Sequence, residues 1–103
     1  MNPFGEEQLR AALGDCFIPG QHRSIVAAAL VRSASLHRDV DAPGATIPGL
    51  PPRYIAHVRL TAPGTDDALN AQLRAIIENR LLGLPQISRA DVTIVPPLFA
   101  ILS

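Results

Sequence analysis

The sequence lacks an excess of charge of either sign: its 103 residues include nine acidic and nine basic side chains, giving a formal net charge of zero. Such a chain offers no electrostatic footprint for nucleic acid or an acidic membrane surface. Apolar residues make up 48% and charged residues 17% of the chain, which is typical of a folded globule. We therefore expect one small domain over residues 1–103, with neither nucleic acid nor membrane as a partner.

Cysteine is nearly absent. Cys16 is the single thiol, so the chain cannot form an internal disulfide, and a reducing compartment is favoured. A secretory signal is not apparent either, because Glu6 and Glu7 stand where such a signal carries positive charge. The longest apolar runs, such as IVAAALV, fall short of the ~20 residues of a membrane span. These absences predict a cytoplasmic protein.

Motifs for catalysis and for cofactors are also missing. Neither G-x-x-x-x-G-K-[ST] nor G-x-G-x-x-G occurs, and no Ser-His-Asp or Cys-His motif stands out. His22, His37 and His57 share no short metal-ligand spacing, although pairing of the two central strands would bring His37 near His57. Cys16 lies on an apolar stripe and is expected to behave as an inert, small hydrophobe. We expect no enzyme activity, no cofactor and no metal site.

The apolar periodicity predicts five elements. They are a helix over residues 6–17, a strand over 30–38, a strand over 54–61, a helix over 66–82 and a strand over 90–95. A buried approach precedes the first strand, although its three alanines would also suit a helical turn. On the second helix, Leu69, Leu73, Ile76, Ile77 and Leu81 form the apolar stripe, and Asn70 and Arg74 are expected largely away from it.

This order predicts an α/β (α+β) two-layer sandwich, with a small mixed sheet and both helices on one face. The first two strands are expected to be antiparallel. A right-handed helical crossover would then place the third strand parallel to the second.

Two segments are candidate contact surfaces for a protein partner. Residues 39–53 contain four of the ten prolines and are expected to form a long loop. The apolar tail at 98–103 follows Pro96-Pro97, and packing on its own sheet is favoured over an interface. The candidate partner residues are Pro48, Leu50, Pro51, Leu98 and Phe99. The alternative for the loop is ordinary surface.

The stretch TAPGTD, residues 61–66, connects the second strand to the second helix and forms a candidate corner made of Thr61, Pro63, Gly64, Thr65 and Asp66. Thr65 is expected to cap the helix, since its hydroxyl can accept hydrogen bonds from the first-turn amides. As a nucleophile it would need a nearby base, and the sequence names none. Anion binding at this helix start would be opposed by Asp66 and Asp67.

Almost the whole chain, from EEQLRAAL to VPPLFAILS, resembles the iron–sulfur cluster assembly domain family. This is the small domain of bacterial assembly accessory proteins, cytosolic iron–sulfur targeting factors, phenylacetate-oxygenase maturation proteins and the N-terminus of Mrp-type ATPases. SIVAAALV stands where the family has S-I-V-D-L-G-L-V, TAPGTD where it has T-x-P-G-C-P, and PPL where it has PPW. Ile18-Pro19-Gly20 replaces its Asp-Pro-Glu turn.

The resemblance implies a degenerate member that lacks the motif cysteine. In the family that cysteine is the proposed cluster-handling group, and Thr65 replaces it with a hydroxyl, a poor ligand for iron. Acidic positions are lost at Ile18, Gly20 and Ala27, and Ala29 replaces a glycine. The resemblance therefore implies a non-catalytic accessory or adaptor protein in iron–sulfur cluster or metalloenzyme maturation, bound to an assembly factor or client. The alternative is a family fold reused as a binding or structural module, with a homo-oligomer left open.

Overall fold

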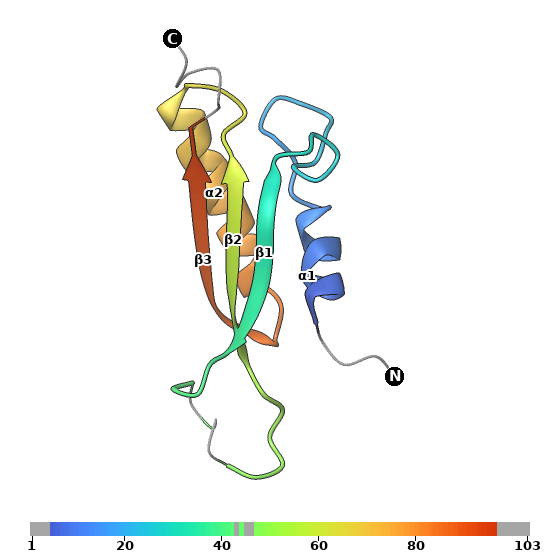
Figure 1. The fold of residues 1–103 in the computed structure, drawn as a ribbon, viewed down its shortest axis with the longest axis vertical. Helices are drawn as coiled ribbons and strands as arrows, with labels where there is room; N and C mark the ends of the chain where they lie inside the picture. Colours follow the sequence, from blue (N-terminus) through green and yellow to red (C-terminus); the bar gives the residue numbers. More distant parts are fainter. Residues whose placement is uncertain (1–4, 43, 45–46, 97–103) are drawn as a thin grey trace.

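The computed structural model describes residues 5–42, 44 and 47–96. Its elements are α1 (Glu6–Leu13), β1 (Val31–Arg38), β2 (Tyr54–Thr61), α2 (Asp67–Leu82) and β3 (Ile87–Val95). The order helix-strand-strand-helix-strand is the one predicted from the sequence, and the fold is a small α+β fold (Figure 1). None of the helices in the described ranges is long and apolar enough to cross a membrane.

The three strands form one mixed sheet with β2 in its centre. β2 pairs with β1 antiparallel and with β3 parallel, and α2 makes the crossover between the two parallel strands. Both strand directions agree with the sequence prediction. Figure 1 shows α2 behind β2 and β3, with α1 beside β1.

The core lies between the sheet and the two helices. Alternation along β2 buries Ala56, Val58 and Leu60, as its period of two requires. From the helices, the fully buried side chains are Leu9, Leu13, Leu73, Ile77 and Leu81. Full burial of one such leucine or isoleucine is worth about 1.5–3 kcal/mol, so this cluster holds the layers together. Neither described helix covers the other face of the sheet, which is called the open face below.

The first helix is shorter than predicted. It ends at Leu13 instead of residue 17, because Gly14 is its C-cap and donates its N–H to the Arg10 carbonyl at 3.0 Å. Cys16 lies beyond the helix but is still buried. Phe17, the last residue of the predicted helix, is 50% exposed and forms an isolated bridge with Ser24.

The segment before β1 is a turn, and the expectation of a buried approach is wrong for most of it. Ser24 and Ile25 are buried, whereas Ala27 and Ala29 are exposed. The Ser24 hydroxyl accepts the Ala27 N–H at 3.0 Å, and its carbonyl accepts the Ala28 N–H at 3.0 Å. This helical turn, the alternative raised by the three alanines, ends at Ala29 with a φ of 57°.

The last strand is longer than predicted and begins at Ile87 instead of residue 90. Tyr54 donates its N–H to the Gln86 carbonyl at 2.8 Å, and Tyr54 pairs with Ile87 at the start of the parallel ladder. The short connection after α2 conceals this start in the sequence, because its polar residues interrupt the apolar pattern.

Candidate functional site

The corner between β2 and α2 is tied to the start of β1. Thr61 ends β2 and donates its N–H to the Leu30 carbonyl at 2.8 Å. Its hydroxyl accepts a 3.1 Å hydrogen bond from the guanidinium of Arg32. Pro63 and Gly64, both half-buried, then turn the chain toward the helix. The predicted residues Thr61, Pro63, Gly64, Thr65 and Asp66 thus form one continuous corner.

The predicted helix cap is wrong by one residue. Asp66 is the N-cap of α2, and its carboxylate accepts the N–H groups of Ala68 at 3.0 Å and Leu69 at 3.3 Å. An aspartate in this position satisfies amides that otherwise have no partner within the helix, and its charge suits the positive helix end. Thr65 is exposed and precedes the cap.

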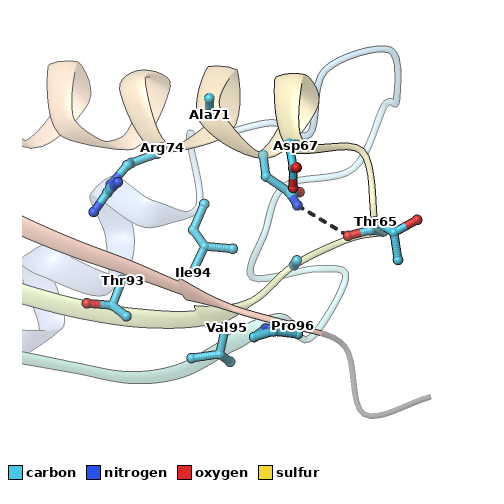
Figure 2. A pocket seen from close by; sticks show the side chains of 11 residues that line it. Thr65, Asp67, Ala71, Arg74, Thr93, Ile94, Val95 and Pro96 are labelled. Carbon is cyan, nitrogen blue, oxygen red and sulfur yellow. Dashed lines mark hydrogen bonds between the residues drawn. The ribbon is translucent and has the colours of Figure 1, made fainter. Parts of the chain in front are cut away.

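A cavity of about 470 Å³ opens beside this corner, between α2 and β3. Gly64, Thr65 and Asp67 line it from the corner, while Ile94 and Pro96 line it from the end of β3. Figure 2 shows Thr65 and Asp67 at one end of this space and Arg74 and Thr93 at the other. The cavity is therefore partly polar and open to solvent.

Asn70 and Arg74 belong to this site, although the sequence pattern placed them away from the packed face of α2. The amide nitrogen of Asn70 donates to the Gly64 carbonyl at 3.3 Å and holds the turn against the helix. Arg74 donates through Nε to the Val92 carbonyl at 3.1 Å. Their spacing of four residues, next to the apolar stripe, is the sequence signal that could have revealed them.

The corner cavity offers hydrogen-bonding groups of three kinds. Thr65 supplies a hydroxyl, Asp67 a carboxylate and Arg74 a guanidinium. No histidine or cysteine belongs to the described residues that line this cavity. The hydroxyl, the carboxylate and the guanidinium can each form hydrogen bonds with a ligand in this cavity.

The only thiol of the chain is part of the core. Cys16 is fully buried, and its Sγ lies 3.7 Å from the Ala12 carbonyl. Burial raises the pKa of the Cys16 thiol to about 11; Arg80 opposes this shift and Asp15 adds to it. Because iron binds the thiolate, this neutral, enclosed thiol is poorly suited to replace the motif cysteine. The expectation of an inert Cys16 agrees with this environment.

Two of the three histidines meet on the open face of the sheet. The rings of His37 and His57 contact edge to face with centroids 4.8 Å apart. Nδ1 of His57 lies 3.4 Å from a carboxylate oxygen of Asp91. His22 is exposed in the segment after α1. Within the described ranges, no group of three His, Cys, Asp or Glu side chains is arranged to hold a metal ion.

The Pro-rich loop presents apolar surface at the opposite end of the molecule from the corner (Figure 1). Val40, Ile47 and Leu50 are 69%, 56% and 53% exposed, and Pro48 and Pro51 are exposed beside them. A mainly apolar cavity of about 390 Å³ lies here, lined by Leu50, Pro51, Pro52 and Pro85, among others. The other two candidate partner residues, Leu98 and Phe99, lie outside the described residues.

Hydrogen bonds join the two ends of the loop where it leaves and re-enters the sheet. Asp39 donates its N–H to the Arg53 carbonyl at 2.8 Å, and its carboxylate accepts the Asp41 N–H at 3.1 Å. The Ser88 hydroxyl donates to the same carboxylate at 2.6 Å. Arg53 donates to the Ile87 carbonyl at 3.0 Å. These contacts could not be predicted from the sequence, because the residues that form them come from three separate segments.

Comparison with known proteins does not assign the chain to a family. No protein-family model matches the chain. No curated protein matches it either.

Proposed function

We propose that the chain is a non-catalytic adaptor in iron–sulfur cluster or metalloenzyme maturation, which acts by binding an assembly factor or a client enzyme. The observation that carries the proposal is the apolar surface of the Pro-rich loop. Val40, Ile47 and Leu50 are all more than half exposed within this one loop. Clustered, solvent-exposed apolar side chains are typical of surfaces that bind other proteins.

The loop also has the mechanical properties of a binding surface. Its two ends are fixed by the Asp39–Arg53 backbone bond and by the Asp39–Ser88 side-chain bond. Proline restricts the backbone, so Pro48, Pro51 and Pro52 reduce the conformational entropy that the loop loses on binding. Leu50 borders the neighbouring cavity and is the best placed anchor.

The backbone at Ala29 supports the family resemblance on which the iron–sulfur part of the proposal rests. Ala29 has a φ of 57°, a left-handed conformation that favours glycine. The family pattern S-I-V-D-L-G-L-V has its glycine at this position. At the corner, Thr65, which the resemblance aligns with the motif cysteine, lines a cavity. An adaptor that handles no cluster needs no thiolate at this corner. The proposal includes a cytoplasmic location.

Anaerobic affinity purification from the source cells tests this function, with the co-purifying proteins identified by mass spectrometry. The wild-type chain is compared with Leu50→Asp and with Val26→Asp, which places the same charge on an exposed valine outside the loop. We expect assembly factors or iron–sulfur client enzymes with the wild type and with Val26→Asp, and their loss with Leu50→Asp. Unrelated partners only, or equal recovery with Leu50→Asp, would contradict the proposal.

A further inference from the structure

The face of the sheet that points away from the helices carries a cluster of cationic side chains. Ala56, Val58 and Leu60 of β2 point into the core, so His57 and Arg59 point to the other face. The register places Asp91 beside His57, and Arg89 beside Ile55. Arg32 reaches the same face through its bond to the Thr61 hydroxyl. No described helix covers these side chains.

The charge on this face is predominantly positive, although the whole chain is neutral. Arg32, Arg59 and Arg89 are all exposed. His37 and His57 lie among them, in contact with each other. Among the described residues of this face, Asp91 is the counter-charge, and it is paired with His57. The charge of Arg89 also acts on Asp39, whose carboxylate already accepts the Ser88 hydroxyl.

The helical layer has the opposite character. Acidic side chains there include Glu6, Glu7, Asp67 and Glu78. Arg80, one of the cations of this layer, is paired with Asp15 at 2.9 Å. The net charge of zero therefore combines a positive sheet face with a negative helical layer. Among its described residues, the sheet face carries the guanidinium groups of Arg32, Arg59 and Arg89 against the single carboxylate of Asp91.

The three arginines form a diagonal stripe. Arg32 lies in β1 at the irregularity between Val31 and Ser33, and its guanidinium reaches the hydroxyl of Thr61 at the end of β2. Arg59 lies in β2, and Arg89 lies level with Ile55 on β3. From Thr61 to Ile55 the strand rises about 20 Å. A rise of about 20 Å corresponds to roughly seven residues of an extended peptide. A guanidinium can bind a carboxylate through two parallel hydrogen bonds.

We infer that the open sheet face, defined by Arg32, Arg59 and Arg89, binds an extended acidic segment of a protein partner. The chemistry favours carboxylates on a peptide over a nucleic acid. Single-stranded nucleic acid is held largely by aromatic stacking, and no Phe, Tyr or Trp lies among the described residues of this face. The inference does not depend on the iron–sulfur proposal.

Fluorescence anisotropy tests this surface with a fluorescein-labelled, alternating glutamate–serine peptide of about eight residues, long enough to span the stripe. The full chain is compared with Arg59→Gln/Arg89→Gln and with Arg10→Gln/Arg23→Gln. Both double variants remove the same charge, and all four arginines are exposed. We expect salt-sensitive binding by the wild type, about tenfold weaker binding by Arg59→Gln/Arg89→Gln, and a change below about twofold in the control. Circular dichroism verifies that each variant is folded.

Four outcomes would overturn the inference. The first is no binding by the wild type at low ionic strength, and the second is equal weakening by both double variants. The third is tighter binding of single-stranded DNA of the same charge than of the peptide, which would assign the face to nucleic acid. The fourth is self-association of the wild type that Arg59→Gln/Arg89→Gln abolishes, which would assign the face to the acidic helical layer of a second copy.

Discussion

The carboxylate of Asp39 accepts a 2.6 Å hydrogen bond from the hydroxyl of Ser88. Asp39 directly follows β1 and Ser88 lies in β3, so the bond joins segments from opposite edges of the sheet. The Ser88 oxygen also lies 3.2 Å from the Tyr54 carbonyl of β2. This contact connects all three strands at the point where the Pro-rich loop begins, which makes it the structural base of the proposed partner surface.

Loss of the Ser88 hydroxyl should give a pH-dependent loss of stability. The hydrogen bond from Ser88 lowers the pKa of Asp39 below its ordinary value of 3.8; burial opposes this, while the Asp41 amide and the charges of Arg89 and Arg53 reinforce it. A lowered pKa in the folded state gives a stabilisation that is present above the unfolded pKa. That stabilisation disappears as the pH falls through the folded pKa.

Ser88→Ala should therefore lower the thermal midpoint at neutral pH, and the difference from the wild type should shrink in acid below about pH 4. Ser33→Ala, at an exposed position on the open face, should leave the midpoint unchanged at both pH values. A constant difference between Ser88→Ala and wild type down to low pH would contradict this role of the Asp39 carboxylate.

The cap of α2 gives a matched pair of neighbouring substitutions. Asp66→Ala should lower the free energy of unfolding by about 1 kcal/mol, because two first-turn amides lose their acceptor. Thr65→Ala should change it by less than about 0.5 kcal/mol, since Thr65 is exposed and precedes the cap. Urea denaturation measures both values. A larger loss of unfolding free energy for Thr65→Ala than for Asp66→Ala would show that Thr65 is the N-cap.

Ala29 provides a test of backbone strain. With φ at 57°, a residue with a Cβ is strained, so Ala29→Gly should raise the free energy of unfolding by about 0.5–1 kcal/mol after the entropy cost of glycine. Ala27→Gly in the same exposed turn should lower it, because Ala27 lies outside the left-handed region. Urea denaturation of the two variants decides the matter; destabilisation by both would exclude relief of strain at Ala29.

Cys16 should react slowly in the folded chain. With its pKa raised to about 11 from 9.0, the thiolate fraction at pH 8 falls about 100-fold. Alkylation by iodoacetamide should slow by at least that factor relative to the chain unfolded in guanidinium. Because the folded pKa is raised, the associated stabilisation is complete below pH 9.0 and is lost as the pH rises toward about 11. Equal alkylation rates would show that the thiol is accessible.

Much of the fold follows from periodicity in the sequence. Strict alternation over Tyr54–Thr61 and the apolar stripe of α2 predicted the bounds of both elements to within one residue. The antiparallel and parallel pairings followed from connection lengths and the handedness of crossovers. A single glycine changed the first element, since Gly14 ended α1 while the apolar spacing continued to Phe17.

The candidate site was less accessible to prediction, because its groups come from segments distant in the sequence. The corner residues were found together since they are contiguous. Asn70 and Arg74 were missed because their contacts, to the Gly64 and Val92 carbonyls, depend on tertiary packing. The same holds for Asp39 and Ser88, which only the sheet brings together.

The most direct test of the adaptor proposal is the acid-labile sulfide content of the co-purifying client enzyme, measured in cells with and without this gene. The proposal predicts a lower sulfide content without the gene, and restoration by the wild-type chain or by Thr65→Val, which removes the corner hydroxyl. Leu50→Asp should fail to restore it. An unchanged sulfide content in cells without the gene would contradict a role in iron–sulfur maturation.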